Sequence, residues 1–340
     1  MSAQSWFNRL WYRGSPPGWL VAASRVYGAA SAARRAAYRR GWLVSRRVGC
    51  PVIVVGNLSV GGTGKTPLVA WLAARLAAAG RRPGIATRGY GGSSAGPRLV
   101  EPGDAAALVG DEPLLLARRT GLPVAIGRAR PAAAQLLVAA GCDVVVSDDG
   151  LQHYALARDV QIVVIDGDRR FGNGRLLPAG PLRESPQRLA AVDAIVVNGG
   201  TPAAGEFAMR LEAPVAVGLC GGAAVPLASF AGRTVHAVAG IANPERFFRM
   251  LRAAGLEVTE HPLDDHATLR ADDIRFPDRN PVLMTEKDAV KCTGLADERH
   301  WFVPVDASFG AADEAALVDR VMRALAAAAR WTGGTASGRG

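Results

Sequence analysis

The clearest chemical signal in the sequence is a glycine-rich segment that ends in adjacent lysine and threonine residues. It follows a run of β-branched residues at 52–55 and precedes a helical stretch at 67–79. Strand, loop and helix in this order predict a P-loop, although Ser59 stands where the strict pattern has its first glycine. Backbone N–H groups in such a loop curl round a phosphate, and the helix N-terminus adds its positive dipole end. The residues expected to bind a nucleotide are Ser59, Gly61, Gly62, Thr63, Gly64, Lys65 and Thr66.

Two P-loop residues have specific expected roles. Lys65 should reach the β- and γ-phosphates, and the Thr66 hydroxyl should ligate Mg²⁺. The composition supports the first role, because the 40 basic residues include only three lysines, Lys65, Lys287 and Lys291. In so arginine-rich a chain, a lysine marks a place where a compact ammonium is needed. A glycine-rich turn without function is the alternative, and the flanking strand and helix argue against it.

A second candidate site is an acidic pair after a predicted buried strand. Residues 143–147 form this strand, and Asp148 and Asp149 follow it. A carboxylate in this position holds Mg²⁺ in P-loop proteins, so Asp148 and Asp149 are the expected metal ligands together with Thr66. Because Asp-Gly is also a common turn signal, the pair could instead form a simple turn.

Further polar clusters fall on predicted loops. Asp111 has a purely structural interpretation, as the cap of a helix that contains residues 114–116. Arg183 also has a purely structural interpretation, as a member of a surface ion pair. The clusters are residues 88–92 with Tyr90, 110–113 with Asp111, 152–153 with Gln152, and 178–184 with Arg183.

These motifs require a sheet whose loops meet at one edge. Helical patterns lie between several apolar runs, which indicates a mostly parallel sheet with ligands at the strand C-termini. The predicted fold class is therefore α/β, with a P-loop NTPase-type mostly parallel sheet, a second, smaller α/β domain and an N-terminal membrane-interface helix. The strands of the first domain are expected at residues 52–55, 84–87, 124–126, 143–147, 160–165 and 194–197.

The length of 340 residues is enough for about two domains. After residue 207 the pattern changes to short strands and loops, with longer predicted elements at 234–239, 281–285 and 311–331. The loop 285–291 holds two lysines, either as a phosphate contact across the cleft or as ion-paired residues at a helix start. We predict an N-terminal arm (1–48), a P-loop domain (49–206), a smaller α/β domain that closes the cleft (207–330) and a disordered tail (331–340).

The excess positive charge lies in the N-terminal arm. Residues 1–50 contain nine arginines and no acidic residue, whereas the other 290 residues carry 31 basic and 30 acidic side chains. This distribution argues against a nucleic-acid-binding protein. The same segment holds eight of the 21 aromatic residues, and aromatic rings with arginine and no acid suit an anionic membrane surface.

We predict that this arm lies in the membrane interface. Arginines interrupt each apolar run before the ~18 residues of a spanning helix, and a cleaved signal peptide fits poorly. The alternative is a solvated basic helix packed on the P-loop domain. Four cysteines without a close pair indicate reduced thiols in a cytosolic compartment. The helix is expected over residues 18–42, with Trp19, Leu20, Val26 and Tyr27 inserted and Arg34, Arg35, Arg39 and Arg40 at the headgroups.

Taken together, the motifs resemble those of the tetraacyldisaccharide 4′-kinase family. The likeness extends from about Trp11 to Arg330, and the order and spacing of the motifs match. Ser185 is a departure, because the family usually has proline there. The segments that carry the resemblance are residues 59–67, 88–92, 110–113, 148–153, 178–184, 243–247, 265–266 and 285–291.

The resemblance implies an activity and a location. Such kinases use ATP and Mg²⁺ to phosphorylate the 4′-hydroxyl of an acylated glucosamine disaccharide 1-phosphate, forming lipid IVA at the cytoplasmic face of the bacterial inner membrane. It also implies site roles: Asp111 and His266 activate the sugar hydroxyl, Lys65 and Arg183 neutralise phosphoryl charge, Asp148, Asp149 and Gln152 organise the metal, and Tyr90 lies near nucleotide or substrate.

A membrane-recruited regulatory P-loop NTPase is the alternative function. It would share the P-loop, the Mg²⁺ ligands and the basic arm, but its output would be a change in switch loops and no phosphorylated acceptor. Phosphorylation of a glycolipid therefore separates the two functions.

Overall fold

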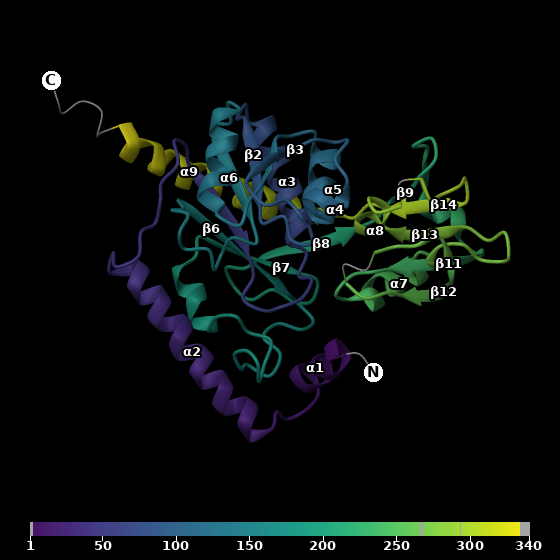
Figure 1. Cartoon of the computed structure of the whole chain (residues 1–340), viewed down its shortest axis with the longest axis horizontal. Coiled ribbons are helices and arrows are strands. Elements are labelled where there is room, and N and C mark those ends of the chain that lie inside the picture. Colours follow the sequence, from purple (N-terminus) through teal and green to yellow (C-terminus); the bar gives the residue numbers. More distant parts are fainter. Residues whose placement is uncertain (1–2, 266–267, 293, 334–340) are drawn as a thin grey trace.

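The computed structural model describes residues 3–265, 268–292 and 294–333. Figure 1 shows two sheets side by side, each with its own helices. The larger sheet has the strand order β15-β8-β7-β6-β1-β5-β2-β4-β3. Its strands are β1 (Val52–Gly56), β2 (Pro83–Thr87), β3 (Arg98–Val100), β4 (Val124–Ile126), β5 (Val144–Asp148), β6 (Val160–Asp166), β7 (Ala194–Asn198), β8 (Phe207–Glu212) and β15 (Asp306–Phe309).

Helices cover both faces of the larger sheet because its central strands are apolar on both sides. Successive side chains of a strand point to opposite faces. Ile53 and Val55 of β1 therefore pack in the core under α3, α5 and α9, while Val52 and Val54 pack in the core under α6. These helices are α3 (Lys65–Ala78), α5 (Asp111–Thr120), α6 (Arg130–Ala139) and α9 (Ala311–Gly333), and the one-turn helix α4 (Ala106–Val109) precedes α5.

Most strands of the larger sheet are parallel, as the sequence predicts. The edge strands β3 and β15 pair antiparallel with β4 and β8, and both were missed from the sequence. The six predicted strands of the first domain are all present, with bounds that differ by two residues at most.

The smaller sheet has the order β10-β9-β14-β13-β11-β12. Strands β12, β11, β13 and β14 run parallel, and β9 is antiparallel to β14. Helix α7 packs Phe247, Phe248 and Leu251 against this sheet. The elements are β9 (Val215–Gly218), β10 (Ala224–Pro226), β11 (Thr234–Ala239), α7 (Pro244–Ala253), β12 (Glu257–Pro262), β13 (Val282–Thr285), α8 (Glu286–Ala289) and β14 (His300–Val303), with short 3₁₀ helices η1 (Pro186–Ala191), η2 (Leu227–Phe230) and η3 (Ala271–Asp273).

The chain leaves the larger sheet after β8 and returns to it with β15. Helix α9 then buries Leu317, Val321 and Leu325 in the core beneath the larger sheet. The division between the sheets therefore does not fall at the boundaries that the sequence indicates, since residues 207–212 and 306–330 join the larger sheet. Residues 331–333, predicted as part of a tail, belong to α9, and residues 334–340 lie outside the described residues.

The arm forms two helices, α1 (Ala3–Tyr12) and α2 (Gly18–Arg39), and α2 runs as a long rod along the outside of the larger sheet (Figure 1). Leu20 is buried, and the Tyr27 hydroxyl donates a hydrogen bond to the carbonyl oxygen of Arg183 (3.2 Å). The prediction that these two side chains enter a membrane is therefore wrong, because they face the protein. Trp19 and Val26 are exposed. No helix among the described residues has the length and apolar character to cross a membrane.

Candidate active site

A cavity of about 970 Å³ lies where the two sheets and helix α2 meet. The P-loop lines it from the larger sheet, Tyr27 and Arg34 from α2, and Arg246 and Lys287 from the elements that follow β11 and β13. Ligands collect at the carboxyl ends of parallel strands, and the loops after β1 and β5 open into this cavity. The predicted nucleotide, metal and phosphoryl-transfer residues border this space, except Ser59 and Asp148, which are buried and do not line it.

The P-loop connects β1 to α3, and α3 begins at Lys65. Gly61 (φ +107°) and Gly64 (φ +93°) have backbone conformations that favour glycine. A buried asparagine supports the loop: Asn198, at the end of β7, donates from Nδ2 to the carbonyl oxygen of Thr63 (2.9 Å). Arg246 of α7 in turn donates to Asn198 Oδ1 (2.7 Å). A hydrogen-bonded chain therefore links the smaller sheet's helix to the phosphate-binding loop.

Asp149 pairs with two cationic side chains beside the P-loop. Its Oδ1 lies 3.7 Å from Lys65 Nζ and 3.0 Å from Arg183 Nη1. Burial opposes ionisation of Asp149, but Lys65 and Arg183 outweigh it and lower the pKa of that carboxyl to about 2. Asp149 is thus an anion throughout the physiological range, and the surface-pair interpretation of Arg183 is replaced by a pair inside the cavity.

Asp148 has the opposite electrostatics. Burial, and next the charge of Glu112, raise the pKa of the Asp148 carboxyl to about 7. Among the described residues its Oδ1 is buried without a hydrogen-bond partner, and the same is true of the Thr63 hydroxyl. A buried carboxylate oxygen with no donor is suited to a cation.

The donor set at this site fits Mg²⁺, which binds one or two carboxylates together with substrate phosphates. Asp148, Asp149 and Thr66 are the oxygen donors beside the P-loop. Within the described part of the chain, no group of three or more His, Cys, Asp or Glu side chains forms a self-sufficient metal cage. Mg²⁺ usually keeps several waters, so waters and substrate phosphates would complete its coordination here.

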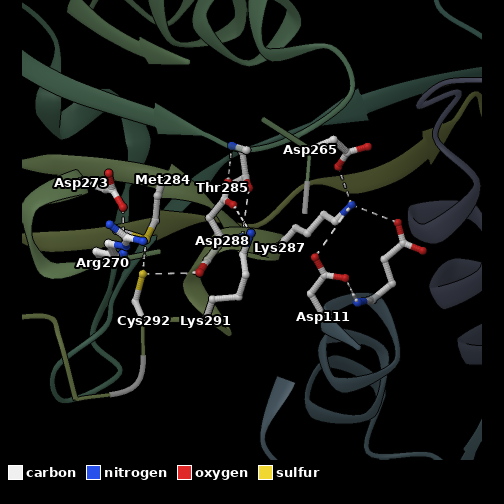
Figure 2. Close-up of polar contacts among 12 residues, drawn as sticks. Asp111, Asp265, Arg270, Asp273, Met284, Thr285, Lys287, Asp288, Lys291 and Cys292 are labelled. Carbon is white, nitrogen blue, oxygen red and sulfur yellow. Dashed lines mark hydrogen bonds and ion pairs between the residues drawn. The ribbon is translucent and has the colours of Figure 1, made fainter. Parts of the chain in front are cut away.

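Asp111 lies in the first turn of α5 and is 5% exposed. Gly110 precedes the helix, so Asp111 is not its N-cap, although its Oδ1 accepts the neighbouring Glu112 N–H (2.9 Å). Lys287, which follows strand β13 of the smaller sheet, has its Nζ 3.9 Å from Asp111 Oδ2 and 2.9 Å from Asp265 Oδ1 (Figure 2). The segment that carries Asp265 is therefore close to Asp111.

His266, the predicted partner of Asp111, lies outside the described residues. Tyr90 is largely exposed and borders the cavity. The Gln152 amide donates to the carbonyl oxygen of Asn57 (3.1 Å), so it holds the loop after β1 as well as lining the cavity. Among the described candidates, all but Ser59, Asp111 and Asp148 therefore line one cavity. The partnership of Asp111 and His266 stays a prediction.

Comparison with known proteins agrees with this geometry. Residues 18–326 match the family of tetraacyldisaccharide-1-P 4′-kinases, LpxK. The chain belongs to this family. A tetraacyldisaccharide 4′-kinase of Alkalilimnicola ehrlichii is 56% identical over 302 residues, 87% of this chain and 91% of that protein. One of Xanthomonas campestris pv. campestris is 52% identical over 332 residues, 92% and 94% of the two chains.

The fold is also that of a solved member of the 4′-kinase family. The crystal structure of LpxK from Aquifex aeolicus in complex with ATP matches with a TM-score of 0.77 at 29% identity, over 90% of this chain and 98% of that chain. The predicted α/β fold class is therefore confirmed, and so is the resemblance to the 4′-kinases.

Three residues that line or support the site of this 4′-kinase family member were missed from the sequence. Arg130 is buried beside the acidic pair, with Nη2 donating to the carbonyl oxygen of Asp148 (3.4 Å). Asn198 and Arg246 support the P-loop from 135 and more residues away. Asn198 gave one usable signal, a polar residue directly after an apolar strand, and Arg246 lies within the family segment 243–247.

Proposed function

We propose that the chain transfers the γ-phosphoryl group of ATP to the 4′-hydroxyl of a tetraacylated glucosamine disaccharide 1-phosphate, which yields lipid IVA. The observation that carries this proposal is the arrangement of charge round one cavity. Lys65 and Arg183 stand on the P-loop side, and Asp111 lies in the turn opposite, next to cavity-lining Glu112. Cations beside a carboxylate base are what transfer to an alcohol requires.

These positions support the following transfer step. The backbone N–H groups of the P-loop and the start of α3 bind the phosphates. The 4′-oxygen attacks the γ-phosphorus as the bond to the bridging oxygen breaks, and ADP leaves with that bonding pair. The hydroxyl proton passes to the Asp111 carboxylate, with His266 as its partner. Lys65 and Arg183 offset the charge that spreads over the phosphoryl oxygens.

We propose that Thr66, Asp148 and Asp149 hold Mg²⁺ when ATP is bound. The ion would supply positive charge that offsets part of the charge on the phosphates. The unpartnered Oδ1 of buried Asp148 supports this assignment. Gln152 positions the loop beside these ligands through its hydrogen bond to the backbone at Asn57, and Tyr90 borders the space where the nucleotide or sugar would lie.

We propose that the outer face of the N-terminal arm rests on an anionic membrane, at the cytoplasmic face of the bacterial inner membrane. An acylated substrate remains in that membrane, so an enzyme at the same surface meets it readily. The arm contributes most of the exposed large apolar side chains of the described chain, namely Trp6, Trp19, Val26, Trp42, Leu43 and Val44.

The deciding experiment uses the purified full chain with γ-labelled ATP, Mg²⁺ and the tetraacyl disaccharide 1-phosphate in detergent micelles. We expect a new labelled lipid, and we expect Lys65→Ala to abolish most of it without changing thermal unfolding. A comparison variant is Lys291→Met, which removes a lysine that pairs with Asp288 (2.7 Å) instead of lining the P-loop and should still form the labelled lipid. Hydrolysis of ATP with no labelled lipid would contradict the kinase proposal and favour the regulatory NTPase.

A further inference from the structure

The turn from β13 to α8 is held rigidly by a buried carboxylate. Asp288 has no exposed surface, and its Oδ2 accepts the Thr285 hydroxyl (2.6 Å) and the Gly240 backbone N–H (2.8 Å). Its Oδ1 pairs with Lys291 (2.7 Å). These contacts tie β11, β13 and α8 together, so the side chain of Lys287, which precedes Asp288, leaves the turn in a defined direction.

Lys287 extends from this turn toward the larger sheet (Figure 2). Its ammonium lies 2.9 Å from Asp265 Oδ1, 3.3 Å from Glu112 Oε1 and 3.9 Å from Asp111 Oδ2. The Lys287 side chain is only 13% exposed. Burial opposes its charge, but Glu112, Asp111 and Asp265 raise the pKa of Lys287 above its usual value. Lys287 is therefore a cation surrounded by three carboxylates.

A second contact fixes α8 against α5. Glu286 Oε2 accepts Arg119 Nη1 (2.8 Å), and Arg119 also donates to the carbonyl oxygen of Val305 (2.8 Å). Glu286 thus meets the last turn of α5, while Lys287 meets its first turn. Contacts at both ends of α5 leave little freedom for Lys287 to move relative to Asp111.

The surroundings of Asp111 explain why a cation is needed there. Asp111 is 5% exposed. Besides Asp111, the carboxylates of Glu112 and Asp265 lie close to the Lys287 ammonium. Burial and neighbouring negative charge both disfavour an ionised carboxylate, and a nearby opposite charge restores it. Only the ionised form can accept a proton from the sugar hydroxyl.

We propose that Lys287 is a positioning residue for the base, holding the Asp111 carboxylate ionised and in place. This inference rests on the proposed function, in which Asp111 takes the hydroxyl proton. Lys287 keeps its own proton throughout the transfer. Lys287 follows a strand of the smaller sheet, and Asp111 lies in α5, which packs on the larger sheet. The contact between Lys287 and Asp111 therefore forms only when the two sheets are held together as they are here.

Two other roles for Lys287 make different predictions. If Lys287 contacted the ATP phosphates directly, its removal would raise the KM for ATP. If Lys287 were only structural, its removal would lower thermal stability and leave the turnover per folded molecule unchanged. A positioning role lowers kcat through Asp111.

The first experiment compares Lys287→Met, Lys287→Arg and Lys291→Met in the lipid phosphorylation assay. Lys287→Met should lower kcat by roughly tenfold or more on the acidic limb of the pH profile, with a KM for ATP close to wild type. Loss of an opposite charge raises a carboxyl pKa by about one to three units, and below that pKa each unit lowers the ionised fraction about tenfold. Lys287→Arg should recover most of the loss because it keeps the charge. Lys291→Met removes a lysine of the same turn and should lower thermal stability more than kcat.

The second experiment is the pH profile of kcat. In the described structure, Lys287 pairs with Asp111, and the other carboxylates around the same ammonium are those of Glu112 and Asp265. Loss of the cation should move the acidic limb to higher pH by about one unit or more, and Lys291→Met should not move it. In an Asp111→Asn background, Lys287→Met should cost little further turnover.

Three results would overturn the inference: a raised KM for ATP at wild-type kcat, an unmoved acidic limb, or an equal loss in both backgrounds. Failure of the proposed function is a separate result. In that case the wild-type chain forms no labelled lipid, whereas an error about Lys287 alone leaves wild-type activity intact and Lys287→Met active.

Discussion

Replacing Gly64 with alanine tests whether the P-loop depends on its support from β7. Gly64 has φ +93°, which alanine rarely adopts. A Cβ at this position would lie 2.5 Å from Asn198 Nδ2 and 3.2 Å from Met209 Cε. Asn198 is buried and its Nδ2 holds the carbonyl oxygen of Thr63. The new methyl group therefore strains the backbone and also displaces the amide that supports the loop.

Both effects have known sizes. A non-glycine residue held in this backbone region costs about 1–3 kcal/mol, and a lost hydrogen bond costs about 0.5–1.5 kcal/mol. Together they lower the free energy of unfolding by about 1.5–4.5 kcal/mol. At roughly 2–4 °C per kcal/mol for a domain of this size, the melting temperature should fall by roughly 3–18 °C.

The assay is thermal unfolding of the full chain without nucleotide, with Gly62→Ala as the matched control. Gly62 lies in the same loop, has no φ in the left-handed region, and its added Cβ would meet nothing within 4 Å. Gly62→Ala should therefore change stability by less than about 1 kcal/mol. If both variants unfold at the same temperature, the argument from Asn198 is refuted.

Three further predictions concern titration, membrane contact and the base. With a pKa of about 7 in the folded chain, Asp148 binds a proton between about pH 4 and 7 that the unfolded chain releases, so stability should fall as pH rises through this range. Asp148→Asn should flatten that slope in urea unfolding without Mg²⁺. Trp19→Glu should weaken binding to anionic vesicles, whereas Leu99→Glu, at another exposed apolar position, should not; equal binding of both would contradict membrane contact through the arm. Asp111→Ala and His266→Ala should each lower turnover, and the double variant should cost far less than the product; independent effects would exclude the dyad.

The sequence predicts the larger sheet well because its strands are continuous apolar runs between turn residues. Residues 124–126 and 234–239 are strands with the predicted bounds. The strands that were missed are short or polar. Strand β12 (Glu257–Pro262) is mostly exposed, and β10 (Ala224–Pro226) has three residues. Such strands form because the backbone of a neighbouring edge strand is available for hydrogen bonding. The residues of the short strand do not encode the presence of that neighbour.

The candidate site shows the same limit. Motif residues such as Lys65 and Asp149 are identifiable because their neighbours in the sequence determine their conformation. Asn198 and Arg246 act through contacts with residues far along the chain, which no local pattern encodes. The helix α2 was predicted, but its apolar residues alone did not distinguish Leu20, which faces the protein, from Trp19, which is exposed.

The return of the chain to the larger sheet has a consequence for synthesis. Domains fold as they emerge from the ribosome, beginning with the N-terminal ones. Here the strand β1 emerges early, yet β15 and the core residues Leu317 and Leu325 of α9 are made last. The smaller sheet, whose strands all lie between residues 215 and 303, can therefore complete its pairing while the larger one still exposes the apolar surface that α9 will cover. A ribosome-bound chain stalled before residue 311 should carry this exposed surface and be the species most dependent on chaperones.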